Sequence, residues 1–241
     1  GLLMQTGQRA PAGLKFVAVG GAAVGAPLIA AAQTLGIPAY EGYGLSEGAS
    51  VQTLNLPGAT RLGSVGRALP HARLRVADDG EIEVAGSLMT GYLGDATDSP
   101  EWWPSGDLGH IDADGYVHIR GRKKNVLISA YGRNISPEWV ETALGQQAVI
   151  RQAVVYGDGE PSLWAVLWPV QNGTSDAALQ TAVDAANATL PDYARITRWT
   201  RGRAAFSPET GYATANGRPQ RTAILAAHAD LRADLTEPLT P

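Results

Sequence analysis

The sequence contains no cysteine, which excludes a disulfide scaffold, a thiolate zinc site and a cysteine nucleophile. The same absence fits a reducing compartment, so we expect a cytoplasmic location. Long apolar runs are also missing. The longest, around residues 24–32, is too short and too rich in alanine and glycine for a transmembrane segment. Dense basic blocks are absent from a chain with a formal net charge of −4, which argues against nucleic acid as a partner.

Two common nucleotide-binding motifs are lacking as well. Neither a G-x-G-x-x-G fingerprint nor a Gly-Lys-Ser/Thr P-loop occurs in the sequence. The pair Gly20-Gly21 follows an apolar run, but such a pair is more typical of a tight turn between a strand and a helix. The four histidines are scattered without metal-ligand spacing, so we expect them in core or surface roles.

The sequence does contain enough apolar material for one large domain or two smaller ones. Of its 241 residues, 44% are hydrophobic and 17% are charged, which is not the composition of a disordered chain. Residues 1–60 predict an α/β segment. Its elements are a short buried strand at Phe16–Val19, a helix at Ala26–Leu35 with Pro27 in the first turn and Gly36 as its cap, and a strand at Ala39–Tyr43.

From residue 62 to about 121 the pattern changes to short strands separated by turn dipeptides. Asp79-Gly80 and Asp114-Gly115 each join two strand-like runs, which predicts two β-hairpins. Such closely spaced strands favour a small β-barrel or a distorted sheet. The polar stretch Gly121–Asn125 follows the last strand and is the clearest domain boundary. Its charges alone indicate an ordinary solvated face.

Residues from about 125 onward predict a compact α+β unit. Ser136 precedes Pro137 and Glu138, the pattern of a helix N-terminus with serine as the N-cap. The remaining pattern predicts strands at 126–129, 152–156, 163–168 and 196–200, and helices at 175–188 and 222–235.

The stretch Tyr40–Glu47 combines the residue types that a nucleotide site needs. Its glycines allow the backbone to approach a flat ligand. An aromatic ring can stack, a hydroxyl can meet a phosphate oxygen, and a carboxylate can hold Mg²⁺. The stretch resembles the Tyr-Gly-x-Thr/Ser-Glu motif of the adenylate-forming (AMP-binding) enzymes, which include acyl-CoA synthetases, adenylation domains of peptide synthetases and luciferases.

Four further segments extend this resemblance in the family's order, so that it covers most of the chain. They resemble the Gly-x-x-Gly-x-Pro approach to the barrel, the Gly-Glu-Ile and Gly-Tyr segment, the Thr/Ser-Gly-Asp motif, and the hinge with its following loop. Here they are Gly63–Pro70, Gly80–Val84 with Met89–Tyr92, Ser105–Gly109, and Gly121–Asn125 with Gly132–Glu138.

The resemblance implies a fold and a domain division. Residues 1–124 would form the end of the large AMP-binding domain, α/β to about residue 60 and barrel-like to about residue 121. Residues 125–241 would form the whole small, mobile α+β domain. The family's Ser/Thr/Gly-rich phosphate loop is absent and would lie in an upstream part of the large domain. We therefore expect a piece of a longer protein, inactive on its own.

The resemblance also implies a reaction. A carboxylic acid and Mg-ATP would give an acyl-adenylate, and coenzyme A would then take the acyl group. Tyr43 would stack on adenine, Asp107 and Arg122 would hold the ribose, and Lys124 would be the hinge. The other implied roles are phosphate contact for Ser46, Mg²⁺ binding for Glu47, lining of the nucleotide pocket by Gly20, Gly21, Ala22 and Gly44, and a place on the pantetheine-tunnel loop for Gly132.

Arg218 departs from the family pattern. The run Asn216-Gly217-Arg218 with Arg221 resembles the terminal Asn-Gly-Lys-x-x-Arg motif, in which the catalytic lysine bridges the carboxylate and the α-phosphate. Arginine keeps the charge but is bulkier and differently shaped. One hypothesis is that Arg218 serves in place of lysine. The other is that adenylation is crippled while thioester formation survives.

The favoured interpretation is part of an ATP-dependent ligase that joins a carboxylic acid, most simply a fatty acid, to coenzyme A. The first alternative is an adenylation domain that loads a carrier protein. The second is a degenerate homologue that binds nucleotide without catalysis, which Arg218 favours and the retained Tyr43, Asp107 and Arg122 oppose.

Overall fold

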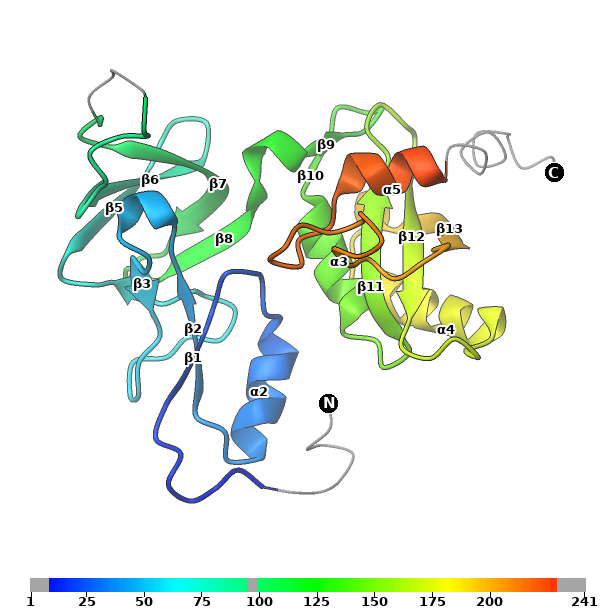
Figure 1. Ribbon diagram of the computed structural model, residues 1–241, viewed down its shortest axis with the longest axis horizontal. Coiled ribbons are helices and arrows are strands. Elements are labelled where there is room, and N and C mark those ends of the chain that lie inside the picture. The colour runs from blue at the N-terminus through cyan, green and yellow to red at the C-terminus, as the bar shows by residue number, and fades with distance from the viewer. Residues whose placement is uncertain (1–8, 95–98, 229–241) are drawn as a thin grey trace. The chain divides into compact units, whose positions relative to one another are not determined.

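A computed structural model describes residues 9–94 and 99–228 of the chain. The chain divides into two compact units, residues 1–124 and residues 125–241 (Figure 1). Within the described residues, no helix is long and apolar enough to cross a membrane.

The first unit begins with a short β-α-β segment. Strand β1 (Val17–Val19) pairs in parallel with β2 (Ala39–Tyr43), and helix α2 (Ala26–Thr34) connects them. Pro27 lies in the first turn of α2, and Gly36, with a φ of 76°, follows its C-terminal end, as predicted. The sheet continues through two short antiparallel strands, β3 (Thr53–Leu54) and β4 (Arg67–Ala68).

The strand near Phe16 is not buried, contrary to the prediction. Among the described residues, β1 is the outermost strand of its sheet and pairs only with β2. Phe16 is 38% exposed and stacks on Tyr40, with ring centroids 4.8 Å apart. The apolar composition of this run predicted burial. Among the described residues, however, β1 has a neighbouring strand along one edge only.

The second part of the first unit is an antiparallel meander. Its strands are β5 (Ala72–Val76), β6 (Glu81–Gly86), β7 (Trp103–Ile111) and β8 (Val117–Arg122), paired in chain order (Figure 1). The turns at Asp79-Gly80 and Asp114-Gly115 join β5 to β6 and β7 to β8, which confirms both predicted hairpins. The predicted barrel-like region is thus a half-barrel, and it is followed by the 3₁₀ turn η2 (Lys123–Asn125).

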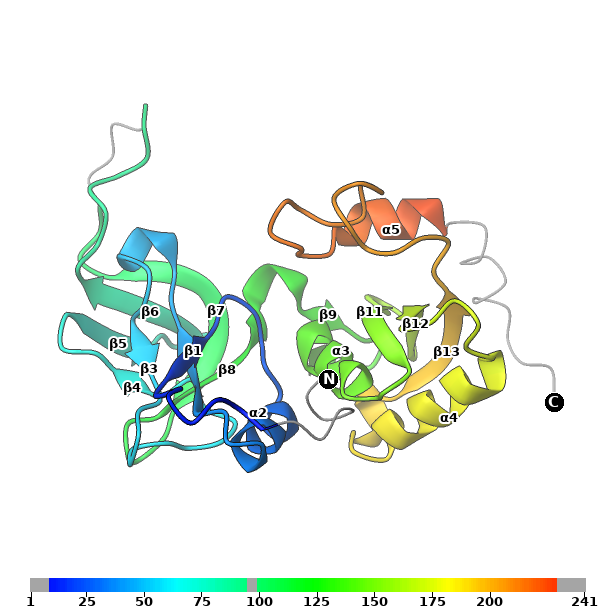
Figure 2. The ribbon, with the colours of Figure 1, turned by 60° about the horizontal axis from the view of Figure 1, so that its bottom comes forward.

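The second unit is a three-stranded sheet covered by helices on both faces. Strands β11 (Ile150–Tyr156) and β12 (Leu163–Pro169) are antiparallel, and β13 (Ile196–Arg201) lies parallel to β12. Figure 2 shows α4 (Asp176–Asn187) and α5 (Arg221–Ala227) on opposite sides of this sheet. The remaining elements are helix α3 (Pro137–Gly145), the two-stranded ribbon of β9 (Leu127–Ile128) and β10 (Asn134–Ile135), the 3₁₀ turn η1 (Ser46–Gly48) of the first unit, and η3 (Asp192–Ala194).

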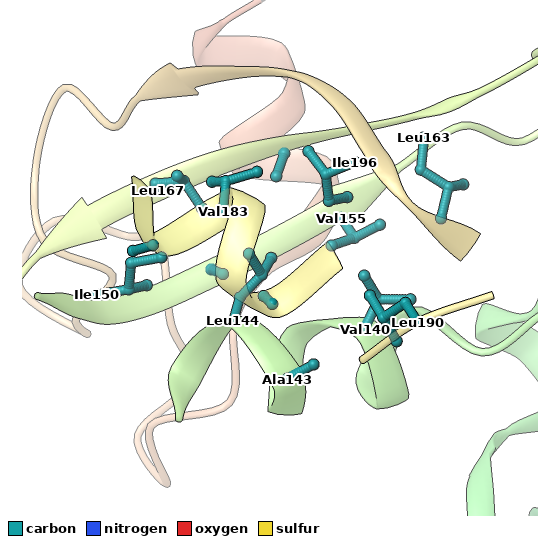
Figure 3. Packing of buried hydrophobic residues seen from close by; sticks show 14 of the residues in the cluster. Val140, Ala143, Leu144, Ile150, Val155, Leu163, Leu167, Val183, Leu190 and Ile196 are labelled. Atoms are coloured by element: carbon teal, nitrogen blue, oxygen red, sulfur yellow. The ribbon is translucent and has the colours of Figure 1, made fainter. Parts of the chain in front are cut away.

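The alternation of side chains along β11 creates two cores. Ala153 and Val155 face α3 and α4, whereas Val154 and Tyr156 face α5. The larger core is shown in Figure 3, where side chains of α3, α4 and all three strands meet. This sandwich fixes the positions of α3, β11 and α5 relative to one another.

Two predicted details of the second unit need correction or restriction. Ser136 does occupy the N-cap position of α3, but its hydroxyl makes no cap bond and instead donates to the Glu138 carboxylate at 3.0 Å. The carboxylate two residues away offers a stronger, charged acceptor. The predicted helix at 222–235 is α5 as far as Ala227, and its part from residue 229 lies outside the described residues.

Truncating the centre of the larger core should destabilise the second unit. Leu144 of α3 is fully buried, so Leu144→Ala should lower the free energy of unfolding by about 2–5 kcal/mol. Ile128→Ala, at a side chain that is 54% exposed, is the control and should change it by less than about 0.5 kcal/mol. Urea dependence of amide exchange in β11 and β12 measures both. If the two substitutions lowered the free energy of unfolding equally, the assignment of Leu144 to the core would be contradicted.

Candidate nucleotide-binding site

Two loops of the first unit leave neighbouring parallel strands at the same edge of their sheet. Residues 20–22 follow β1, and Tyr43 is the last residue of β2, directly before the next turn. A Cβ on Gly20 would lie 2.8 Å from the carbonyl oxygen of Gly42, so only glycine permits this approach. Glu41 of β2 accepts a hydrogen bond from the Val24 amide at 3.0 Å. Burial raises the pKa of the Glu41 carboxyl. These contacts bring Gly20, Gly21 and Ala22 beside the Tyr43 turn.

The turn that carries Ser46 and Glu47 is tightly folded. A Cβ on Gly44 would lie 1.6 Å from the carbonyl oxygen of Ser50, so that position requires glycine. The buried Gln52 side chain accepts a hydrogen bond from the Leu45 amide at 2.8 Å and donates to the Gly48 carbonyl. Ala49 and Ser50 hold φ angles of 62° and 82°, a region that side chains rarely adopt. Such locally strained backbone is common at ligand sites.

Tyr43, Asp107 and Arg122 form one hydrogen-bonded cluster. The Tyr43 hydroxyl donates to Asp107 Oδ2 at 2.7 Å, and Arg122 Nε lies 3.0 Å from Asp107 Oδ1. Asp107 stands directly opposite Arg122 in the β7–β8 register. Asp107 lies on strand β7 and is only 7% exposed, and Arg122 and Tyr43 compensate for the burial of its charge.

This cluster fixes the position of the Tyr43 ring. Burial, reinforced by the negative charge of Asp107, raises the pKa of the Tyr43 hydroxyl well above its usual value. The hydroxyl therefore remains a donor to the carboxylate at any physiological pH. A ring held at its hydroxyl end stays in one place, which suits stacking on a planar base.

Glu47 lies in the same turn and is held by Tyr92. The Tyr92 hydroxyl donates to Glu47 Oε1 at 2.6 Å, and this bond holds the pKa of the Glu47 carboxyl below its usual value. No motif of the sequence indicated a role for Tyr92 itself. Within the described residues no group of three His, Cys, Asp or Glu side chains could hold a metal alone. Mg²⁺ commonly uses one or two carboxylates together with substrate phosphates, and Glu47 fits that arrangement.

Glu81 and Lys123 support the site and were missed by sequence reasoning. Glu81 Oε1 accepts a hydrogen bond from the Gly106 amide at 2.7 Å, next to Asp107. Lys123 Nζ lies 2.8 Å from Glu81 Oε2 and 2.6 Å from Asp79 Oδ2. These carboxylates raise the pKa of the Lys123 ammonium. Lys123 thus ties the basic run that looked like a solvated face to Glu81 at the start of β6 and to Asp79 in the turn before it.

The remaining predicted site residues lie outside the strands that carry Tyr43, Asp107 and Arg122. Lys124 is the last residue of the first unit, within η2, and Ser46 is exposed at the start of η1. Gly132 is in the turn between β9 and β10 with a φ of 73°. Arg218 is exposed in a turn before α5. Their roles toward a nucleotide or coenzyme A stay predictions.

Comparison with known proteins now assigns the family. A model of the AMP-binding enzymes matches residues 2–93, and a model of the AMP-binding enzyme C-terminal domain matches residues 124–233. The chain belongs to the AMP-binding enzymes. This confirms the resemblance on which the expected site was based.

Individual relatives agree with this assignment. The chain is 38% identical over 154 residues to a long-chain-fatty-acid–CoA ligase of Mycobacterium tuberculosis, covering 61% of this chain and 26% of that protein. It is 33% identical over 187 residues to an indoleacetate–CoA ligase of Aromatoleum aromaticum, covering 68% of this chain and 36% of that protein. The match thus spans only about a quarter to a third of the length of these two relatives.

Solved structures confirm the mixed α/β and half-barrel fold. The o-succinylbenzoate–CoA synthetase of Bacillus subtilis, in complex with its acyl-adenylate intermediate, matches with a TM-score of 0.77 at 23% identity. The match covers 92% of this chain and 48% of that one. Other structures of that Bacillus enzyme contain ATP with magnesium ion, or AMP.

Two substitutions at Tyr43 should separate its ring from its hydroxyl. Tyr43→Phe keeps the stacking surface and loses only the bond to Asp107, so AMP affinity should fall by about tenfold or less. Tyr43→Ala removes the surface, and we expect a further loss of about 1–3 kcal/mol of binding free energy. Calorimetric titration with AMP in the full-length protein measures both. Equal affinities for the two variants would argue against stacking on Tyr43.

Proposed function

We propose that the chain is the C-terminal portion of an ATP-dependent ligase that activates a carboxylic acid, most simply a fatty acid, as an acyl-adenylate and transfers it to coenzyme A. The observation that carries the proposal is the joined cluster of Tyr43, Asp107 and Arg122 in a chain of the AMP-binding enzymes. The names of the curated relatives, which are CoA ligases for fatty acids and for indoleacetate, support the same reaction class.

Nucleotide binding in this proposal is the work of the first unit. The face of Tyr43 stacks on adenine, and the backbone of residues 20–22 with Gly44 lines the same pocket. Asp107 accepts hydrogen bonds from the ribose hydroxyls, since a carboxylate can accept several at once, and Arg122 donates to them. Ser46 contacts a phosphate oxygen. Glu47, ionised at neutral pH, holds Mg²⁺, which when bound neutralises phosphate charge.

The second unit would complete the reaction. Residues 1–124 would be the end of the large domain and residues 125–241 the mobile small domain, turning about Lys124. Arg218 would place its guanidinium between the substrate carboxylate and the α-phosphate, where charge stabilisation lowers the barrier. Gly132, on the turn between β9 and β10, would line the path of the pantetheine group of coenzyme A. A cytoplasmic location stays a prediction.

One observation favours a second candidate. Arg218 stands where the family pattern has lysine, and a protein that has lost adenylation could retain Mg-ATP binding through Tyr43, Asp107 and Arg122. In that case the chain belongs to a nucleotide-binding protein without ligase activity. An acceptor other than coenzyme A, such as a carrier protein, has no specific support in the structure.

Carboxylate-dependent exchange of pyrophosphate into ATP tests the proposal. The full-length protein should exchange with one class among short, medium, long and aromatic acids. Arg218→Lys should exchange at least as fast, because lysine restores the family's group at this position. The 241-residue chain alone should not exchange, because the phosphate loop is absent from it.

The outcomes separate the candidates. Mg-ATP binding without exchange by any acid, followed by restored exchange in Arg218→Lys, would establish the second candidate. Pyrophosphate exchange by the 241-residue chain alone would contradict the proposal that the reaction needs a phosphate loop outside this chain.

A further inference from the structure

Arg221 holds an ion pair that the proposed chemistry does not use. It is the first residue of α5 and comes three positions after Arg218. Its Nη1 and Nη2 atoms donate to the two carboxylate oxygens of Glu141 in α3, each at 2.6 Å. The two side chains are only 22% and 14% exposed. Paired hydrogen bonds of this kind fix relative orientation as well as distance.

Further bonds attach the same pair to strand β11. Glu141 Oε1 also accepts from the Val155 amide at 2.7 Å, and Arg221 Nη1 donates to the Val155 carbonyl at 3.2 Å. The Tyr156 hydroxyl donates to the main-chain carbonyl of Arg221 at 2.9 Å. Both the side chain and the backbone of Arg221 are therefore fixed to the central sheet of the second unit.

The segment before Arg221 is a hairpin closed by its own hydrogen bonds. The Thr214 amide donates to the Arg218 carbonyl at 2.9 Å, and the Gly217 amide to the Thr214 carbonyl at 2.8 Å. Ala213 and Pro219 form an isolated β-bridge below this turn. Because the hairpin is held together internally, its direction depends on the residues at its base, of which Arg221 is the best anchored.

The network also reaches the start of the second unit. Glu138 Oε1 accepts from Asn125 Nδ2 at 2.6 Å and lies 3.5 Å from Arg221 Nη2. The Ser136 hydroxyl donates to the other Glu138 oxygen. Asn125 follows Lys124, the predicted hinge. A continuous set of polar contacts thus joins the residue after the hinge to the base of the Arg218 hairpin.

Stability alone does not explain this arrangement. A cation at the N-terminus of a helix opposes the helix dipole. A buried ion pair commonly contributes no more than an apolar pair of the same volume. Burial raises the pKa of the Glu141 carboxyl, which shows that desolvation works against its charge. What the pair does provide is one fixed orientation of Arg221 relative to Glu141.

We infer that Arg221 and Glu141 are positioning residues for Arg218: their paired hydrogen bonds fix the base of the hairpin and so set where the Arg218 guanidinium is presented. The contacts through Glu138 make the hairpin and Asn125 move together when the small domain turns. This inference rests on the proposed function of Arg218, but the ion pair can also be tested without activity.

The first test measures the two half-reactions separately in the full-length protein. Arg221→Met should slow pyrophosphate exchange by on the order of 100-fold, the effect of misplacing a reacting group by about 1 Å. Thioester formation from acyl-adenylate supplied ready-made should change little. The double variant Arg221→Met with Glu141→Met removes both charges, so it should recover thermal stability but not exchange. Arg195→Met, at an exposed ion pair with Asp192 in the same unit, is the matched control.

The second test is independent of activity and also uses the full-length protein. The Gln220 amide donates to the Tyr212 carbonyl at 2.8 Å, at the base of the hairpin and next to Arg221. Hydrogen exchange at this amide should be faster in Arg221→Met than in the natural protein, and unchanged in Arg195→Met. Unchanged exchange at Gln220 would overturn the inference, as would an equal fall in both half-reactions or recovered adenylation in the double variant. If Arg221→Met fails to fold, Glu141→Gln takes its place in both tests. Absence of adenylation in the natural protein would remove the proposed function, whereas the Gln220 amide would still report on the ion pair.

Discussion

The site in the first unit depends on the burial of one carboxylate. Asp107 is a charged group with little access to water, and such a group is tolerated only when partners replace its hydration. Arg122 supplies the opposite charge from the adjacent strand, and Tyr43 supplies a hydroxyl from the other sheet. The bond from Tyr43 also joins the β-α-β segment to the half-barrel. The ring that we propose to stack on adenine and the carboxylate that we propose to bind the ribose are therefore placed together by one constraint.

The backbone around this cluster limits how far its parts can move. Gly44 admits no side chain, Gln52 closes the turn through two hydrogen bonds, and Glu81 holds the Gly106 amide beside Asp107. A preorganised site of this kind avoids the cost of ordering its groups when a ligand binds. In the second unit, an ordinary helix-covered sheet gives the same rigidity to the Arg218 hairpin through Arg221.

Local signals in the sequence predicted much of the fold. Helix α2 and both hairpins follow from residues next to each other in the chain, such as Pro27, Gly36 and the Asp-Gly turns. Strands β3, β4 and β10 have two residues each and form only because tertiary partners are present, so no local pattern indicates them. The strand that carries Asp107 contains Pro104 and Gly106. Both residue types are unusual inside strands, so the sequence pattern did not indicate a strand at this position.

The site was predictable as a set of residues but not as a geometry. The motifs named Tyr43, Asp107 and Arg122, yet their direct bonding depends on strand register. Glu81 with Lys123, and Glu141 with Arg221, are pairs separated by 42 and 80 positions. Contacts over such distances have no signature in a single sequence, so the supporting residues became visible only in the structure.

The central claim, that Asp107 organises the nucleotide site by binding the ribose, is tested most directly by comparing two ligands. Affinities for AMP and for 2′,3′-dideoxy-AMP should be measured in the full-length protein and in its Asp107→Asn variant. The natural protein should prefer AMP by about tenfold or more, as expected for hydrogen bonds to a charged group, and the variant should lose this preference. A variant that remains folded and keeps the full preference for AMP would contradict the claim.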